Sequence, residues 1–469
     1  MQTELLSRFT TLDNFGHSLR AASYRFRPAR AEEIPAILDI ATRTGLTVAA
    51  RGAGRSYNDA ALNGGQIVLD LSGMNHILEW NPDSGLVRCE PGVTLEQLWQ
   101  RVEPDGWWPP VVSGTMRTTL GGCLAANIHG KNNFQLGPIG EHATEFTALL
   151  PAGGEVICSP GRDPDLFFAM IGGLGMLGIF VSITLQMKRI HSGLLTVDAW
   201  PVANLRQHLR DLRERAPDYD YIVGWLDTTA RGAAMGRGQI HAARYLLAGE
   251  DSNPKASLRA ENQVLPTRLL GVFPKAALHR LMRPFVNNLG TSAINTAKYL
   301  TALRRHSFRQ SHAAFHFLLD YVPNWERSYG SGGLIQYQSL LPKAAAADVY
   351  LEMLRHCKHS GLPSYLGVLK RHRPDKFLLS HAVDGYSLAL DFRVTSGNAA
   401  RLVKLANDLD TIALRAGGRF YFAKDITLDR KEVARFLGEK ALQKFKTLKH
   451  KVDPHSLLQT DFYRRCFDI

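Results

Sequence analysis

The amino-acid sequence predicts an α+β fold with more than one domain. Helical and extended patterns alternate along the N-terminal part, and glycines stand where one pattern gives way to the other. Near residue 197 the pattern changes to longer helices and alternating strands. The chain is also 469 residues long, which is more than one hydrophobic core usually organises. We therefore expect the chain to divide into the ranges 1–195, 196–414 and 415–469.

The first range is predicted to alternate helices and strands. Thr94 stands where a helix would begin, and its hydroxyl suits the capping position. Residues 105–133, rich in Trp, Pro and Gly, are expected to form a loop. The other predicted elements are a helix at 31–45, strands at 46–50, 66–71, 76–80 and 86–91, a helix at 94–104, a hairpin at 145–160, a helix at 163–173 and a strand at 177–189.

The middle range is predicted to combine helices with alternating strands, most clearly at 332–342, 364–372 and 386–394. The last range again has the glycine, aromatic and lysine content of the first. We therefore expect it to return to the first domain.

Composition limits where the protein works. The N-terminus carries early acidic residues without an apolar run, so it does not resemble a secretory signal, and no stretch approaches the roughly 18 apolar residues of a spanning helix. Five scattered cysteines without a Cys-x-x-Cys pair indicate free thiols in a reducing compartment and no metal site. We expect a cytoplasmic protein, either soluble or peripheral at the inner face of the plasma membrane.

The net charge of +13 is partly local. Residues 259–309 contain nine Lys or Arg side chains against one acid, Glu261, and Leu, Phe and Ile are interleaved with them. A solvated helical face over a core would explain this pattern, and so would a surface that meets anionic lipid headgroups or a phosphorylated lipid. No nucleic-acid-binding motif accompanies the charge, so we expect no nucleic-acid partner.

A glycine-rich loop, RGAGRSYNDAALNGG, covers residues 51–65 after the strand expected at 46–50. It lacks the third glycine of a dinucleotide fingerprint and the Gly-Lys-Ser/Thr of a Walker loop. A plain hinge between strands would account for the glycines. However, successive small residues expose backbone N–H groups, and arginines flank them, which suits a pyrophosphate.

Two further glycine clusters follow. Residues 113–133 place Gly114, Gly121, Gly122 and Gly130 among hydroxyl, Asn, His and Lys side chains, and residues 172–179 read GGLGMLGI. Such spacing lets the backbone approach a flat or anionic ligand closely. His129 as a core histidine and Lys131 on a solvated loop remain open alternatives.

In order, these three segments resemble flavoproteins of the vanillyl-alcohol-oxidase or para-cresol methylhydroxylase (PCMH) type. The stretches ANIHGKNN, NWERSYGSGGLIQYQ and GGRFYFAKD resemble, within it, the branch of decaprenylphosphoryl-ribose oxidases, over about residues 20–466. The resemblance implies a PCMH-type FAD-binding domain of two α+β subdomains. It also implies a substrate-binding domain with an antiparallel sheet flanked by helices.

The resemblance implies FAD as the cofactor. The residues that match the family's FAD site are Arg51, Gly52, Ala53, Gly54, Arg55, Ser56, Tyr57, Asn58, Gly114, Thr115, Thr119, Leu120, Gly121, Gly122, Ala126, Asn127, Ile128, His129, Ile179 and Tyr421. Relatives that bind flavin covalently often have a histidine where this chain has Arg55. We therefore expect FAD that dissociates, so that acid precipitation releases the yellow colour from the pellet.

The implied reaction removes hydride from a secondary alcohol of a furanose and gives the hydroxyl proton to a base. Lys424, His129 and Tyr57 are the implied catalytic residues, and either Lys424 or His129 could take the proton once its pKa is lowered. The implied substrate residues are Lys131, Gln336, Gln338, Lys370, Ala389, His316 and Arg327. Trp225 and Tyr329 are weaker candidates, for which a structural role in the core is favoured.

The chain departs from the family pattern at some positions. Ala389 replaces the cysteine that covalent inhibitors trap in relatives, His316 stands at the position of a family tyrosine, and Asn58 stands where glycine is frequent. Redox chemistry therefore cannot need a thiol at position 389.

The leading hypothesis is an FAD-dependent oxidase or dehydrogenase that converts the 2′-hydroxyl of a polyprenyl-phosphate-linked ribose to a ketone. This step would be the first half of an epimerisation towards arabinose for the cell wall, completed by a separate NAD(P)H-dependent reductase. One alternative is a soluble sugar, alditol or aldonolactone oxidase. Another is a non-catalytic membrane- or nucleic-acid-associated protein on a flavin fold.

Overall fold

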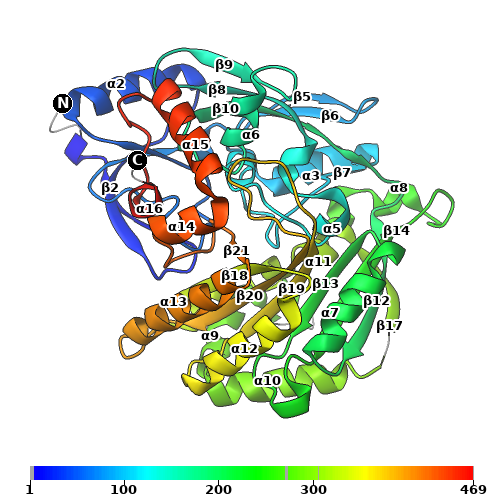
Figure 1. The fold of residues 1–469 in the computed structure, drawn as a ribbon. Helices are drawn as coiled ribbons and strands as arrows, with labels where there is room; N and C mark the ends of the chain where they lie inside the picture. Colours follow the sequence, from blue (N-terminus) through cyan, green and yellow to red (C-terminus); the bar gives the residue numbers. More distant parts are fainter. Residues whose placement is uncertain (1–4, 270–272, 305, 468–469) are drawn as a thin grey trace.

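The computed structural model describes residues 5–269, 273–304 and 306–467, and it has the predicted α+β architecture. The N-terminal part contains two sheets, shown in blue to green in Figure 1. The first has the strand order β1-β2-β4-β3, with β2 and β3 parallel to β4. Its strands are β1 (Phe9–Asp13), β2 (Arg20–Phe26), β3 (Val48–Arg51) and β4 (Ile67–Asp70).

The second sheet is antiparallel and has the order β5-β6-β10-β8-β9. Its strands are β5 (Ile77–Asn81), β6 (Leu86–Cys89), β8 (Ala143–Leu149), β9 (Glu155–Cys158) and β10 (Ile179–Gln186). A small pair joins β7 (Trp107–Trp108) to β11 (Lys188–Arg189). The helices of this part are α2 (Ile34–Thr44), α3 (Leu95–Val102), α4 (Leu120–Ala125), α5 (Asn133–Leu136) and α6 (Pro164–Met170).

The local signals in this part are largely confirmed. Thr94 caps α3 in a capping box with Gln97, as its position predicts. Gly45 ends α2 in the left-handed conformation, with φ of 67°. The loop expected at 105–133 is different, because it contains the short helices α4 and α5. Two glycines in the six residues of α4 give it a weak helical signal in the sequence.

The middle of the chain builds one large antiparallel sheet with the order β17-β12-β14-β13-β19-β20-β18-β21. The helices α7, α12 and α13 pack against its strands and lie on one side of it in Figure 1. The strands are β12 (Leu194–Val202), β13 (Tyr221–Leu226), β14 (Gly238–Tyr245), β17 (His306–Ser311), β18 (Leu334–Pro342), β19 (Leu366–His372), β20 (Gly385–Arg393) and β21 (Arg419–Phe420).

The remaining elements of this part connect the strands of the large sheet. A short pair, β15 (Arg268–Leu269) and β16 (Phe273–Pro274), lies in the connection from β14 to β17. The helices are α7 (Leu205–Glu214), α8 (Pro254–Ser257), α9 (Leu278–Met282), α10 (Asn288–Thr301), α11 (His312–His316), α12 (Ala346–His359) and α13 (Ala399–Arg415).

The C-terminal segment runs from the large sheet back to the N-terminal part. After β21 it forms α14 (Arg430–Leu437), α15 (Glu439–Val452) and α16 (Asp461–Cys466), which lie beside the N-terminal strands in Figure 1. Leu458 bridges to Val48 of β3, and Arg465 forms an ion pair with Asp59. Lys449 is buried and donates to the Met176 carbonyl. These contacts support the division at 195 and 414, which we retain as a proposal.

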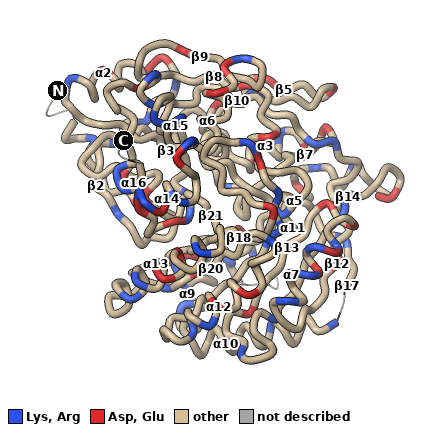
Figure 2. The backbone as a smooth tube through the Cα atoms, in the orientation of Figure 1, with Lys and Arg blue, Asp and Glu red and all other residues tan. Residues whose placement is uncertain are grey.

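Residues 259–309 include α9, α10, the short strands β15 and β16, the start of β17 and short 3₁₀ turns, and residues 270–272 and Arg305 of this range lie outside the described residues. Figure 2 shows Lys and Arg over both parts of the molecule, so the positive charge is not confined to this segment. Among the described residues, no helix is long and apolar enough to cross a membrane.

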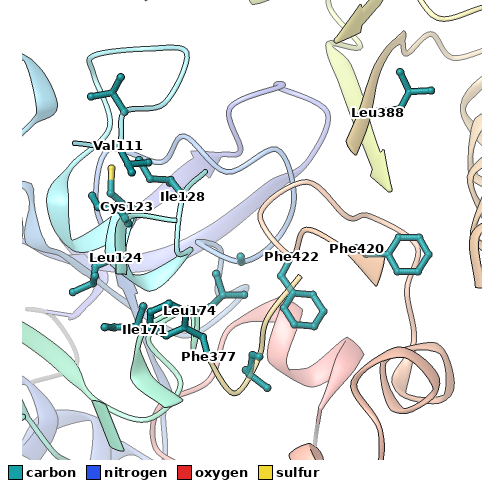
Figure 3. Close-up of a cluster of buried hydrophobic side chains, with 14 of the residues drawn as sticks. Val111, Cys123, Leu124, Ile128, Ile171, Leu174, Phe377, Leu388, Phe420 and Phe422 are labelled. Carbon is teal, nitrogen blue, oxygen red and sulfur yellow. The ribbon is translucent and has the colours of Figure 1, made fainter. Parts of the chain in front are cut away.

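A buried apolar cluster supports the glycine segments. Cys123, Leu124 and Ile128, in α4 and the loop after it, lie together with Ile171 and Leu174 in Figure 3. Backbone hydrogen bonds join the same segments, since Leu174 N donates to Ala125 O at 2.9 Å. The second and third glycine clusters are thus packed into one body.

Candidate functional site

A cavity of about 490 Å³ lies between the large sheet and the glycine segments. Its floor is the face of the sheet opposite to the covering helices. Its walls come from the first loop, from α4 and the residues around it, and from the segment 421–424. The site therefore combines residues from all three ranges of the chain.

The floor follows from the register of the strands. Side chains two residues apart on a strand share a face, and directly paired residues on neighbouring strands share it too. Trp225 of β13 pairs with Val368 of β19, and Val368 pairs with Ala389 of β20, which pairs in turn with Gln338 of β18. The other side chains of this face that line the cavity are Val223, His241, Leu366, Lys370, Ser387 and Gln336.

The glycine wall is made by close contact between two segments. A Cβ added at Gly52 would lie 2.0 Å from the Thr119 hydroxyl oxygen, and one at Gly121 would lie 2.7 Å from the Pro91 Cβ. These positions admit only glycine without movement of their neighbours. The Thr119 hydroxyl is buried and has no hydrogen-bond partner among the described residues.

The first loop is fixed by its arginine and by the C-terminal segment. Arg51 donates to the carbonyls of Ala61 and Asp13, each at 2.8 Å. Tyr57 N donates to Ala423 O at 2.9 Å, and the Tyr57 ring packs edge-on against Phe15. The loop that a hinge could have explained is therefore a rigid part of the cavity wall.

The charge of the cavity has one sign. Among the described residues that line it, none is Asp or Glu. The cations on the wall are Arg51, Arg55, Lys131, Lys298, Lys370 and Lys424. Burial lowers the pKa of Lys131 to about 7 and that of Lys298 to about 8, and no carboxylate opposes either shift. The cavity is suited to anionic ligands at both ends.

His129 lies at the centre of a buried polar group. Its Nε2 is 3.0 Å from the side-chain amide nitrogen of Gln338, and Lys370 donates to its carbonyl at 3.3 Å. The rings of His372 and Tyr421 lie 4.8 Å and 5.0 Å from its ring. Burial first, and then the Lys370 charge, holds the pKa of His129 well below its usual range. His129 is therefore neutral at pH 7.

Lys424 differs because a carboxylate supports its charge. Burial lowers the pKa of Lys424 to about 8, while the charge of Asp391 opposes that shift. Burial raises the pKa of Asp391 to about 6, although the Gln336 amide donates to it and Lys424 is nearby. The Lys424 ammonium lies 5.7 Å from the centre of the Tyr57 ring. The pair therefore contains an amine, that of Lys424, whose pKa is close to neutral pH, so that it can accept a proton.

Most residues singled out in the sequence lie on the cavity wall. These are Arg51, Gly52, Ala53, Gly54, Arg55, Ser56, Tyr57, Gly114, Thr115, Thr119, Gly121, Gly122, Ala126, Ile128, His129, Lys131, Trp225, His316, Gln336, Gln338, Lys370, Ala389, Tyr421 and Lys424.

Some candidates lie elsewhere. Asn58 is buried and donates to the Phe422 carbonyl, so it holds the C-terminal segment against the first loop. Asn127 accepts from Gly140 N at 3.0 Å. Leu120 and Ile179 are in the apolar core, and Arg327 is exposed.

Tyr329 packs in the core, as favoured for it, whereas Trp225 lies on the cavity floor. The sequence did not single out Lys298, His241, Ser387 or Asp391. The strand pattern could have indicated Ser387 and Asp391, because each is two residues from Ala389 and therefore lies on the same face of β20.

Residues 22–159 match the family model of the FAD binding domain. Together with the relative described next, this match shows that the chain belongs to the PCMH-type family of FAD-dependent oxidoreductases. Decaprenylphosphoryl-β-D-ribose oxidase of Mycolicibacterium smegmatis is 30% identical over 440 residues, which is 92% of each chain.

Other relatives match a shorter part of the chain. Cytokinin dehydrogenase 10 of Oryza sativa subsp. japonica is 31% identical over 185 residues, 37% of this chain and 34% of the relative. D-Lactate dehydrogenase of Anaerostipes hadrus is 27% identical over 187 residues, 37% of this chain and 39% of the relative. The expectations of fold class, cofactor and oxidoreductase activity are confirmed.

The residues present fit FAD. The backbone is accessible from the cavity at Gly52 and Gly121, because these residues have no side chain that would fill the space beside it. The buried Thr119 hydroxyl and the buried Nε of Arg55 have no hydrogen-bond partner among the described residues, and both groups suit phosphate oxygens. Gly54, with φ of +64°, turns the loop between the two arginines.

Proposed function

We propose that the protein oxidises the 2′-hydroxyl of a polyprenyl-phosphate-linked ribose to a ketone. The observation that carries this proposal is the cavity lined by six cations and, among the described residues, by no carboxylate. If Arg51 and Arg55 serve the pyrophosphate of FAD and Lys424 is the base, the lysines left for the anionic part of the substrate are Lys131, Lys298 and Lys370. The relative of matching length bears the name of an oxidase of such a phosphorylated ribose.

For the cofactor, we assign the residues of the first loop and of the α4 region that lie on the wall, together with Tyr421 and His129. Leu120, Asn127, Ile179 and Asn58 support this site from behind through packing and hydrogen bonds. Arg55 is not a nucleophile, which supports FAD bound without a covalent link at this position.

The proton of the alcohol goes to Lys424 in this proposal. Protonated Lys424 is stabilised by the Asp391 carboxylate, whereas protonated His129 would face the Lys370 and Lys424 charges without any acid. An amine whose pKa lies near the working pH is also the more effective base. Neutral His129, held by Gln338, then orients the substrate hydroxyl. Bound FAD supplies the acceptor for the hydrogen that leaves carbon.

The substrate sugar is held by polar side chains of the floor. Gln336, Gln338 and Lys370 project from one face of β18 and β19, and Lys131 and His316 stand at the adjacent wall. His316 is packed between Trp108 and Tyr221, with ring distances of 5.7 Å and 4.5 Å, so it shapes the wall. Ala389 leaves room where a larger side chain would narrow the floor.

The surface of α9 and α10 supports membrane docking beside the cavity. It combines exposed apolar side chains with Arg280, Arg283 and Arg304, a pattern that favours anionic lipid surfaces. The exposed apolar residues of these two helices are Leu281, Met282, Leu289, Ile294 and Leu300, and the exposed Phe285 and Leu303 lie between and just after them. We therefore propose that the enzyme is peripheral at the cytoplasmic face of a membrane. A separate NAD(P)H-dependent reductase would reduce the ketone.

A soluble sugar, alditol or aldonolactone oxidase is the competing function. Uncharged polyols would leave Lys131 and Lys370, which are half-buried and form no ion pair among the described residues, without an anion, and burial penalises such a charge. A flavin fold without turnover is disfavoured by the Lys424–Asp391 pair, whose pKa values lie on either side of neutrality.

The test is anaerobic reduction of the bound flavin, monitored as the loss of its visible absorbance. A polyprenyl-phosphoryl ribose with a short lipid is expected to bleach the flavin, and ribose, arabinitol and aldonolactones are not. Bleaching by the free sugars alone would refute the phosphorylated substrate.

A further inference from the structure

Lys298 and His241 form a second polar group at the end of the cavity away from Lys424. Lys298 projects from α10, and its ammonium lies 4.1 Å from the centre of the Trp225 ring. His241, on β14, pairs with Val223 of β13 and therefore shares the floor with Trp225. Neither residue is part of the machinery proposed above for the proton or for the cofactor.

The position of Lys298 is set by the packing of α10 on the sheet. Arg237 is the residue just before β14. It donates to the Thr296 hydroxyl at 3.1 Å, and its guanidinium lies 4.6 Å from the centre of the Tyr299 ring. Asp227 holds the same arginine in an ion pair of 2.9 Å. The helix is therefore anchored, and Lys298 is aimed at the floor.

The charge of Lys298 is without a counterion. Among the described residues it forms no ion pair, and although the residue is partly exposed, desolvation of its ammonium lowers its pKa. Burial and then the charges of Lys298 and Lys131 lower the pKa of His241 to about 4. The ammonium of Lys131 is directed to the Phe315 carbonyl and lies 4.2 Å from that ring. Three basic groups thus converge on one space.

We propose that Lys298 and His241, with Lys131 beside them, bind the phosphodiester of the glycosyl phosphate substrate. This inference rests on the proposed function. Neighbouring strands are about 5 Å apart, so a furanose over β19 and β20 would have its anomeric phosphate over β13, below Lys298. Leu318 lines the cavity and is 51% exposed, which gives a lipid chain an apolar side chain to pass on leaving the cavity.

The test compares two ligands that differ only in phosphate, octyl β-D-ribofuranosyl phosphate and octyl β-D-ribofuranoside. Their Kd values are measured on the FAD-loaded protein from the perturbation of the flavin spectrum. The variant Lys298→Met keeps the apolar stem and removes the charge, and His241→Gln keeps a hydrogen-bonding side chain. We expect Lys298→Met to reduce the preference for the phosphate ligand by roughly 10- to 100-fold, as loss of a charge-assisted hydrogen bond does. His241→Gln replaces one neutral hydrogen-bonding group by another of different shape, so we expect a smaller reduction, of roughly 2- to 10-fold.

Lys404→Met is the matched control, since Lys404 is an exposed lysine of α13 that pairs only with Asp408 among the described residues. It is expected to leave the preference unchanged. A wild-type protein that does not prefer the phosphate ligand would contradict the proposed function itself. A preference that persists in both variants would overturn only the assignment of Lys298 and His241. Inorganic phosphate that binds as tightly as the glycosyl phosphate would also overturn it, because the site would then take the free anion.

Discussion

At the scale of single residues, the proposed reaction depends on how Asp391 sets the charge of Lys424. If Lys424 takes the hydroxyl proton, only its neutral form is active. kcat/KM should therefore rise with pH and level off above a pKa near 8. Asp391→Asn removes the charge that stabilises the ammonium, so the rise should move to lower pH. The pH profile of flavin reduction in the wild type and in this variant measures the shift.

Lys424→Met should reduce kcat/KM by roughly 10²- to 10⁴-fold, the usual contribution of a general base. Retention of bound FAD in this variant shows that the loss concerns the reaction and not the cofactor. A rate that falls through the same pH range in the wild type would mean that the ammonium is the active form, and it would contradict the assigned role.

Position 389 leads to a second prediction. Nitroaromatic inhibitors that trap a thiol should form no mass adduct with this protein, because Ala389 offers none. The cavity does contain Cys123, but burial raises the pKa of its thiol to about 12, so it stays protonated. Ala389→Cys should restore one adduct per chain in intact-mass spectra. An adduct on the wild-type protein would contradict the prediction.

Individual site residues differ in how well the sequence reveals them. Lys424, His129 and the first-loop residues stand in recognisable motifs, and the structure puts them on one cavity. Lys298 and His241 stand in no motif and are 57 positions apart, so only tertiary contacts such as that of Lys298 with Trp225 of β13 bring them together. Lys298 was recognisable in the sequence only as one of nine basic residues in a segment.

At the scale of elements, the glycine loop is predicted to serve FAD through its backbone. Gly54 has φ of +64°, and a Cβ there would lie 2.1 Å from the Arg51 guanidinium. Gly54→Ala should therefore displace Arg51 from its two carbonyl partners and weaken FAD binding by more than tenfold. The absorbance ratio of flavin to protein after gel filtration, and titration of the apoprotein with FAD, measure the loss.

Gly65→Ala is the matched control for this prediction. Gly65 belongs to the same loop and has a similar φ of +70°, but a Cβ there would have no neighbour within 4 Å. This variant meets the same backbone strain, of about 1 kcal/mol, without touching Arg51. Equal loss of FAD in both variants would show that strain, and not the arginine, is responsible.

The elements also show which patterns a sequence carries reliably. The alternating run at 332–342 is β18, and its period-two pattern correctly places Gln336 and Gln338 on one face. The helix α4 was not predicted, because its two glycines have low helix propensity. Packing against Ile171 and Leu174 stabilises the helix in the folded protein. Tertiary contact, which no local pattern encodes, decides such short elements.

At the scale of the whole molecule, the cavity and the docking surface are connected. Leu318 belongs to the cavity wall and is itself exposed, and α10 carries both Lys298 and the exposed Leu289 and Ile294. In the proposed function, the sugar would enter the cavity while the lipid stays near this exposed apolar surface.

The final prediction concerns this surface. The protein should partition onto vesicles that contain phosphatidylglycerol, less so onto neutral vesicles, and less as salt increases. Leu289 is 84% exposed, and Leu289→Glu should reduce partition by more than tenfold, because burial of a leucine contributes about 1.5–3 kcal/mol and the new charge repels anionic lipid. Leu247, 67% exposed beside Glu250 and Asp251, gives the control Leu247→Glu, which should leave partition unchanged. Co-sedimentation with vesicles measures both. Equal loss in the two variants, or wild-type binding that ignores lipid charge and salt, would refute α9 and α10 as the docking surface.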